Sequence, residues 1–195
     1  MKVLVIYSHQ NPKSFSNEIL NVVVSEFKEK GHEVNVRDLY AIGFDPVLKG
    51  ADFEKLFAGT VSDDVKIEQD YIRNADLLVF IHPIWWASMG AVMKGYIDRV
   101  FSMGFAYKYT AQGPEGLLKG KKAFLINNMG SPVEFYEKIG MINAFKLTLD
   151  QGIFGFCGID VVEHIFNGGV PSASEEQKKQ YLEAIKTSIS RISNG

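Results

Sequence analysis

The stretch of the chain with the clearest chemical potential joins an apolar run to two aromatic side chains. Residues 78–86 read LVFIHPIWW, so a segment typical of a buried parallel strand reaches Pro83 and is followed by Trp85 and Trp86. Ligands of open α/β sheets bind beyond the carboxyl ends of the strands. Two adjacent indoles cannot both enter one core, so at least one is expected to line a surface cleft or a partner. The arrangement is typical of a site for a flat aromatic ligand such as a flavin.

A second segment has the composition of a phosphate-binding loop. Residues 8–17 read SHQNPKSFSN and lead from an apolar strand into a helix. Small hydroxyl residues at a helix N-terminus, where backbone N–H groups lack partners, favour phosphate binding. Simple capping by Ser14 or Ser16 is the alternative, and His9 either donates to phosphate or only caps the loop. Neither a G-x-G-x-x-G fingerprint nor a Walker loop is present, so a nicotinamide Rossmann domain and a P-loop kinase are not predicted.

Two further segments complete the candidate site. Residues 127–132, NNMGSP, follow a predicted strand and can supply backbone amides and a flexible glycine, and Tyr136 follows close enough to reach over a ligand. The amides of residues 84–87 can bond the polar edge of a flavin ring. Residues 105–109, FAYKY, are either packing residues or the far wall of an apolar substrate slot.

Other chemistries lack the residues that they need. The four histidines are dispersed, so no metal site is predicted, and no G-x-S-x-G elbow for a hydrolase occurs. Cys157 lies among apolar residues and is expected to be a buried structural thiol. His82 follows a strand and is also expected to be structural. Asp63-Asp64 and Glu175-Glu176 are interpreted as solvated helix starts.

Strand and helix patterns alternate along the whole chain. Strands are predicted at 2–7, 34–39, 76–82, 122–127 and 159–165, and helices at 15–30, 63–74, 88–103 and about 174–192, with one or two more between the last two strands. This alternation predicts one α/β domain over residues 1–195, a parallel doubly wound sheet with helices on both faces. The runs at 4–6 and 78–80 are the most apolar and therefore central, which predicts strand order 2-1-3-4-5. A ligand should bridge the loops after residues 7, 82 and 127.

Composition narrows the classes of partner. Net charge is −2 and the basic residues are scattered, so neither nucleic-acid binding nor binding to an anionic membrane surface is predicted. No window approaches the roughly 20 apolar residues of a transmembrane segment, and the first residues form too short an apolar run for a signal peptide. A cytoplasmic protein with small-molecule partners is expected.

Short motifs in a fixed order resemble one known family. They are HQNPKSF at 9–15, DLY at 38–40, FDP at 44–46, PIWW at 83–86, KGYIDRVF at 94–101, GFAY at 104–107, GLLKGK at 116–121 and FCG at 156–158. Each motif alone is weak, but the ordered set, from residue 1 to about 165, is specific. The chain resembles the NAD(P)H:quinone oxidoreductases of the flavodoxin-like fold.

The resemblance implies an enzyme, an NAD(P)H dehydrogenase (quinone), that works as a homodimer with its substrate slot at the subunit interface. A hydride would pass from NADH or NADPH to flavin N5, and two electrons to a quinone-like acceptor, in a ping-pong cycle. FAD is favoured over FMN because the Pro-Lys-Ser-Phe loop looks like that of FAD-binding members. Tyr136 is the candidate catalytic residue, at the flavin O2/N1 edge. The implied flavin-binding residues are His9, Ser14, Phe15, Ser16, Asn17, Pro83, Ile84, Trp85, Trp86, Ala87, Asn127, Asn128, Met129 and Gly130, and Phe105, Ala106 and Tyr107 would line the slot from the facing subunit.

The chain also departs from the family pattern. Where the family often has Thr-Thr-Gly-Gly, this chain has Asn-Asn-Met-Gly at 127–130, and a histidine that assists hydride transfer in some members has no counterpart. Two other functions stay open on the sequence alone. One is a one-electron carrier of the flavodoxin type, although such carriers are usually strongly acidic. The other is a regulatory flavoprotein subunit of a membrane transporter.

Overall fold

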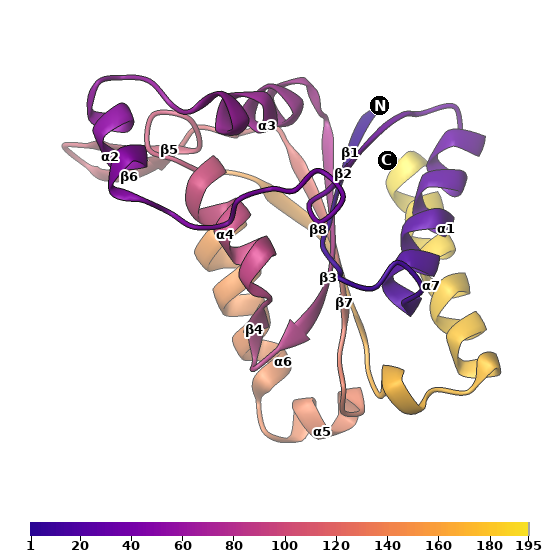
Figure 1. Cartoon of the computed structure of the whole chain (residues 1–195). Coiled ribbons are helices and arrows are strands. Elements are labelled where there is room, and N and C mark those ends of the chain that lie inside the picture. Colours follow the sequence, from indigo (N-terminus) through magenta and orange to yellow (C-terminus); the bar gives the residue numbers. More distant parts are fainter. Residues whose placement is uncertain (195) are drawn as a thin grey trace.

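A parallel sheet forms the centre of the computed structural model, which describes residues 1–194 (Figure 1). Its strands are β1 (Lys2–Tyr7), β2 (Glu33–Asp38), β3 (Leu77–Trp85), β7 (Lys122–Asn128) and β8 (Asp160–Asn167). The order across the sheet is β2-β1-β3-β7-β8, all neighbours being parallel. The predicted fold class and strand order are therefore confirmed, and the order reverses between β1 and β3.

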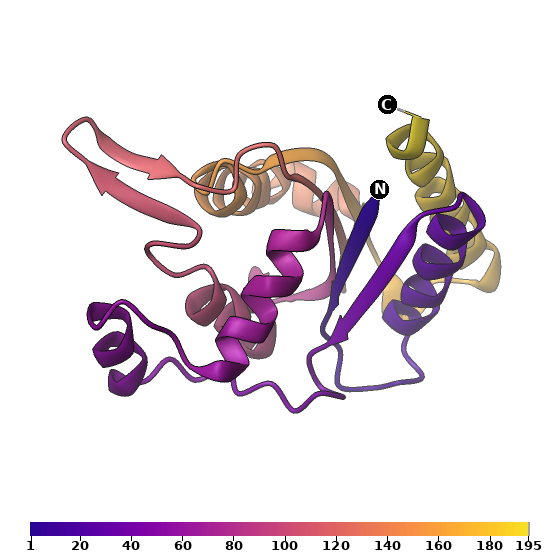
Figure 2. The ribbon, with the colours of Figure 1, turned by 90° about the horizontal axis from the view of Figure 1, so that it is seen from above.

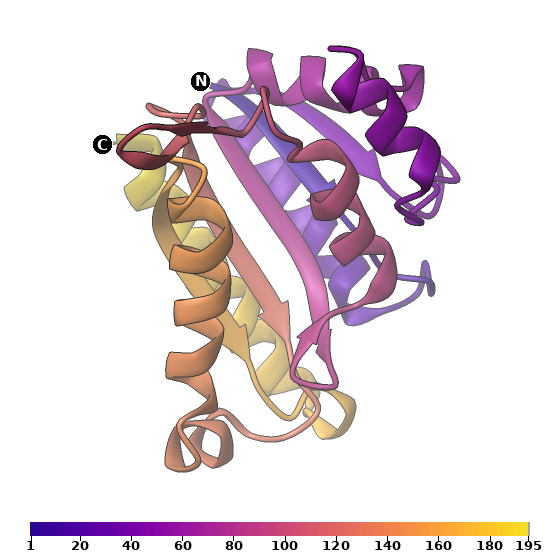
Figure 3. The same ribbon diagram turned by 90° about the vertical axis from the view of Figure 1, so that its left-hand side faces the viewer.

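Helices cover both faces of this sheet. On one face lie α1 (Phe15–Glu29) and α7 (Glu175–Asn194), and on the other α3 (Asp63–Asn74), α4 (Ala91–Val100) and α6 (Met141–Phe145), which continues into a π-helix, η1 (Lys146–Gly155) (Figures 1 and 3). Strand residues alternate between the two cores. Val3 and Val5 pack toward α1 and α7, whereas Leu4 and Ile6 pack toward α3 and α4.

Local sequence signals explain where the main helices begin and end. Ser174 caps α7, because its hydroxyl accepts a hydrogen bond from the N–H of Gln177 at 3.2 Å. Helix α1 ends before Gly31, whose φ of 79° lies in the left-handed region that favours glycine. In α4 a Cβ at Gly95 would collide with the backbone of Pro46. The glycine of the KGYIDR motif thus permits close packing of that helix.

Strand β3 is longer than predicted and does not stop before Pro83. The carbonyl of Ile81 accepts a hydrogen bond from the N–H of Ser8, where β1 has just ended. Pro83, two residues on, faces the same side, so its missing N–H deprives no neighbouring strand of a bond. The chain then turns back at once. Residues Ser88–Met89 form β4, antiparallel to the end of β3, so that helix α4 begins at Ala91 instead of residue 88.

Several small elements were not predicted. They are α2 (Gly50–Phe57), the hairpin of β5 (Tyr107–Thr110) and β6 (Gly113–Gly116), and a third helical segment between β7 and β8, counted as α5 (Val133–Lys138), α6 and η1. Helix α2 buries none of its residues, and the hairpin extends away from the sheet (Figure 2). Both elements are short, so few residues are available for a periodic pattern to show.

Of the two aspartates at the start of α3, Asp63 is exposed as predicted, but Asp64 is not merely solvated. Asp64 accepts a hydrogen bond from the buried Arg99 at 2.6 Å, and Asp52 of α2 lies 3.1 Å from the same guanidinium. Burial works against ionisation of Asp64, but the bond from Arg99 prevails and lowers the pKa of its carboxyl. This cluster ties α2 and α3 to α4. No helix of the described residues has the length and apolar content that crossing a membrane requires.

Candidate functional site

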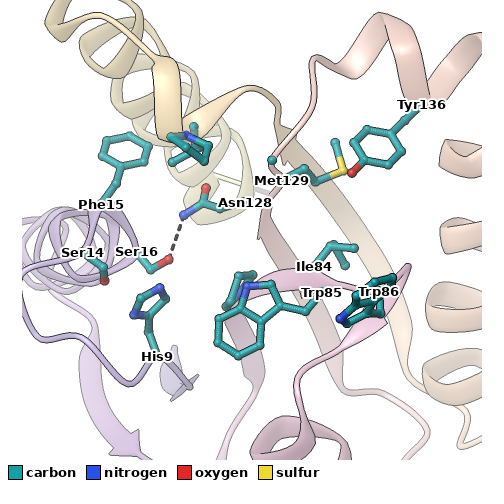
Figure 4. A pocket seen from close by; sticks show the side chains of 14 residues that line it. His9, Ser14, Phe15, Ser16, Ile84, Trp85, Trp86, Asn128, Met129 and Tyr136 are labelled. Atoms are coloured by element: carbon teal, nitrogen blue, oxygen red, sulfur yellow. Dashed lines mark hydrogen bonds between the residues drawn. The ribbon is translucent and has the colours of Figure 1, made fainter.

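A cleft of about 480 Å³ lies at the carboxyl edge of the sheet, at the point where the strand order reverses. The three predicted loops meet there, since the segments after β1, β3 and β7 all contribute to its wall (Figure 4). Its lining residues are His9, Ser14, Phe15, Ser16, Pro83, Ile84, Trp85, Trp86, Asn128, Met129, Gly130, Tyr136, Val170 and Pro171.

The start of α1 forms one side of this cleft. Ser14 is the N-cap, and its hydroxyl accepts a hydrogen bond from the N–H of Asn17 at 3.3 Å, so the capping interpretation is correct for this serine. Ser16 accepts a bond from the Asn128 amide at 2.9 Å instead. Within the described residues the N–H groups of Phe15 and Ser16 have no hydrogen-bond partner. These two donors, at the positive end of the helix dipole, are suited to an anion.

His9 both caps the loop and presents a donor. Its Nδ1 accepts a hydrogen bond from the N–H of Asn11 at 3.0 Å. The proton of the neutral ring is therefore on Nε2, which is left to donate. Burial lowers the pKa of His9 and so favours this neutral form. The ring lies between the start of α1 and the indole of Trp85, 6.1 Å from the indole centroid (Figure 4).

The two tryptophans lie on a strained hairpin. Trp85 pairs with Ser88 across a two-residue turn, whose central residues Trp86 and Ala87 have φ values of 49° and 56°. Such turns favour Asn-Gly, because positive φ strains residues that carry a Cβ. Trp86 is fully exposed and Trp85 is 41% exposed, and both line the cleft. At least one indole was expected to line a surface cleft or a partner, and both line this cleft.

The loop after β7 and helix α5 form the opposite wall. The side-chain oxygen of Asn128 accepts a hydrogen bond from the side-chain amide of Asn167 at 2.9 Å, so both ends of the Asn128 side chain are held by neighbours. The N–H of Met129 is bonded to the Asn167 carbonyl at 2.8 Å, whereas that of Gly130 has no partner within residues 1–194. Figure 4 shows the ring of Tyr136 beside the Met129 sulfur, above the cleft. An aromatic ligand would thus lie between indoles and this loop.

Comparisons with known proteins agree with this geometry. The model of the flavodoxin-like fold matches residues 1–189. A Haemophilus influenzae protein named an uncharacterized NAD(P)H oxidoreductase is 35% identical over 184 residues, covering 94% of this chain and 91% of the relative. Human ribosyldihydronicotinamide dehydrogenase (quinone) is 34% identical, with 94% and 88% covered. The solved NAD(P)H:quinone oxidoreductase of Methanothermobacter marburgensis superposes with a TM-score of 0.87 at 28% identity, covering 97% of this chain and 95% of that one.

The chain belongs to the NAD(P)H:quinone oxidoreductase family of the flavodoxin-like fold. The resemblance predicted from its ordered motifs is confirmed. The names of its relatives also support the predicted class of enzyme.

Three residues predicted from the family resemblance to bind the flavin do not line the cleft, and three others, predicted to line the slot from a facing subunit, lie elsewhere in this chain. Asn17 and Ala87 lie beside the cleft, on the first turn of α1 and in the hairpin turn. Asn127 is wholly buried and points away from it, toward His82. Phe105, Ala106 and Tyr107 lie at and before the β5–β6 hairpin; the first two are buried in their own chain, and Tyr107 borders a separate hollow beside α2, α3 and α4.

Two lining residues that were not predicted, Val170 and Pro171, follow β8. The N–H of Val170 bonds to the carbonyl of Met129 at 3.1 Å, which holds this loop beside the one after β7. Topology alone was a usable signal, because the carboxyl ends of all parallel strands meet at one edge.

Two residues predicted to be structural are confirmed as such. Cys157 is buried, and burial raises the pKa of its thiol to about 11, so it is not an activated nucleophile. His82 is buried and bonded within the protein. Among the described residues, no group of three His, Cys, Asp or Glu side chains could hold a metal ion.

Proposed function

We propose that this chain is a flavin-dependent NAD(P)H:quinone oxidoreductase. The observation that carries the proposal is the convergence of three kinds of contact on one cleft. Unpaired N–H donors at the start of α1, an indole wall after β3 and the loop after β7 surround it. The names of the full-length relatives favour this function over an electron carrier or a transporter subunit.

The residues of the cleft fit the parts of a flavin. Nε2 of His9 and the N–H groups of Phe15 and Ser16 would bind its phosphate, because all three are donors at the positive end of a helix. The isoalloxazine ring would lie between the indoles and the Met129–Gly130 loop. We propose FAD as the cofactor, because the Pro-Lys-Ser-Phe loop resembles that of FAD-binding members of the family. FMN is the alternative.

The bound flavin would supply the redox chemistry, accepting a hydride from NADH or NADPH at N5 and passing two electrons to a quinone-like acceptor. The protein orients the partners. A slot walled by Trp86 and by Phe105 and Tyr107 of a second copy would take one planar ring, stacked at the reacting distance of about 3–3.5 Å. Nicotinamide and quinone must therefore occupy the slot in turn. The hydroxyl of Tyr136 would stabilise charge at the O2/N1 edge of the ring.

A homodimer is also part of the proposal. Phe57 is 79% exposed on α2, and Tyr109 is 68% exposed on the β5–β6 hairpin, beside the half-buried Tyr107. Exposed aromatic side chains on neighbouring elements are typical of an interaction surface. A second copy would cover them and bring its Tyr107 toward the slot. The chain has a mass of 21.8 kDa, and light scattering of the purified protein should give twice that value.

The test is the steady-state rate with NADH or NADPH varied against several fixed concentrations of menadione. A shared slot predicts parallel double-reciprocal lines. Intersecting lines would require both substrates to bind together and would contradict it. Protein loaded with flavin that oxidises NADH and NADPH no faster than free flavin, with any quinone, would contradict the proposed function itself.

A further inference from the structure

A chain of hydrogen bonds crosses three strands just below the cleft. Nδ1 of His164 on β8 lies 2.7 Å from the carboxylate of Asp150 on η1, and its Nε2 lies 2.8 Å from the carbonyl oxygen of Asn127 on β7. The Asn127 amide nitrogen lies 3.1 Å from Nε2 of His82 on β3, whose Nδ1 lies 3.1 Å from the carbonyl of Pro83. The three strand side chains are almost fully buried.

The orientation of the Asn127 amide is fixed by its neighbours. Besides the His82 ring, its nitrogen lies 3.0 Å from the backbone carbonyl of His82. Turning the amide over would place two acceptors, the Asn127 oxygen and that carbonyl, against each other in a buried site. The nitrogen of Asn127 therefore faces His82 and its oxygen faces His164.

This orientation determines the protons on both imidazoles. His164 lies between two acceptors, the Asp150 carboxylate and the Asn127 oxygen, so both bonds form only if both ring nitrogens carry a proton. The ring is then an imidazolium paired with Asp150. His82 differs, since its Nδ1 needs a proton to bond the Pro83 carbonyl, whereas the Asn127 amide, a donor 3.3 Å from Nδ1 and 3.1 Å from Nε2, leaves Nε2 as the acceptor of a neutral ring. Burial, together with the nearby His164, lowers the pKa of His82 to about 4, consistent with a neutral ring.

None of the four linked residues lines the cleft, but two of them directly precede residues that do. His82 precedes Pro83, and Asn127 precedes Asn128. The last bond of the network ends on the Pro83 carbonyl, at the base of the tryptophan hairpin. Glu163, the other charged residue beside His164 on β8, lies toward α7, where it bonds Arg191. Asp150 is therefore the carboxylate that balances the imidazolium.

We propose that His164, held as an imidazolium between Asp150 and Asn127, is a positioning residue that fixes the Pro83 backbone and with it one wall of the cleft. That this wall contacts a flavin rests on the function proposed above; the network itself does not. The bonds link Asp150 on η1, through His164 and Asn127, to His82 on β3.

Nitrogen-15 NMR of the imidazole rings at pH 7 tests the network without any cofactor. The chain has four histidines, so each can be assigned with one His→Gln variant. We expect His164 to show two protonated nitrogens and His82 to show one, on Nδ1. A neutral, singly protonated His164 would overturn the proposal.

The variant Asp150→Asn removes the charge and keeps the shape of the side chain. We expect His164 to lose one proton and the signals of His82 to shift, although residue 150 does not touch His82. Glu163→Gln is the matched control, a carboxylate removed from the other face of β8, and should change neither ring. Unchanged His82 signals in Asp150→Asn would overturn the positioning role.

Flavin affinity, measured on the same variants, separates the two proposals. Loss of one charged hydrogen bond predicts that Asp150→Asn binds flavin about tenfold more weakly, with Glu163→Gln unchanged. If the unmodified protein binds no flavin, the proposed function fails, and the network is judged on the imidazole signals alone. If it binds flavin and Asp150→Asn binds equally well, the positioning role is wrong.

Discussion

The two halves of β3 follow different rules. Residues 77–81 are completely buried, and they pair with β1 on one side and β7 on the other. Beyond His82 and Pro83 the same strand loses β1 as a neighbour, turns through two residues with positive φ and exposes two indoles. The first half stabilises the fold. The second half has exposed side chains and a strained backbone, as residues of binding sites often do.

The largest effect on stability is expected in the buried half. Phe80 packs against Phe154, with ring centroids 4.8 Å apart, and is wholly buried. Phe80→Ala should lower the free energy of unfolding by about 3–5 kcal/mol because it removes contacts and leaves a cavity. Urea unfolding measures this loss. Phe80→Leu is the control and should cost less than half as much; equal losses would mean that Phe80 is not a packing centre.

At the boundary between the halves, we expect a dependence on pH. Burial lowers the pKa of His82 from 6.5 to about 4. Between these values the unfolded chain binds a proton that the folded protein does not, so stability should fall as the pH falls through this window. The shifted pKa of His82 should account for a loss of roughly 3 kcal/mol in the free energy of unfolding at pH 4. Urea unfolding of His82→Gln at pH 7 and pH 4 should show a smaller difference than the unmodified protein, and an equal difference would refute this account.

In the exposed half, Trp86→Ala should separate binding from stability. Loss of a stacked indole predicts flavin binding weaker by about 1–3 kcal/mol. The free energy of unfolding should change by less than about 0.5 kcal/mol, since the indole is exposed in this chain. Calorimetry and flavin titration measure the two quantities. A large loss of stability with unchanged flavin affinity would make this indole a packing residue, and Trp86→Phe should keep most of the affinity.

The smallest effect tests the strain of the hairpin. Ala87→Gly should stabilise the fold by about 1 kcal/mol, because glycine adopts positive φ without steric cost. Ala184, exposed within α7, is the matched control, and Ala184→Gly should destabilise by about the same amount. Thermal unfolding of both variants is the measurement. A loss of stability in Ala87→Gly comparable to that in Ala184→Gly would mean that the turn is not strained.

The sequence predicted the buried half of β3 much better than the exposed half. Long apolar runs determined the strands and their order, because burial on both faces leaves a signal in every residue. The hairpin was not predicted, since Trp-Ala is an unusual pair for a turn with positive φ. The His164 network depends on residues from three strands and a π-helix, which no local pattern brings together. The loops after β1, β3 and β7 were predicted correctly because topology, not local pattern, determines their meeting point.

Flavin binding in the cleft can be measured directly through the two tryptophans. The chain has two, Trp85 and Trp86, and both line the cleft, so its tryptophan fluorescence reports on that wall alone. Protein freed of any bound cofactor should be titrated with FAD and with FMN, and N-acetyltryptophanamide titrated in parallel to correct for absorption by the flavin. We expect quenching that saturates at one flavin per chain. Fluorescence that follows the free tryptophan control at every concentration of both flavins would contradict it.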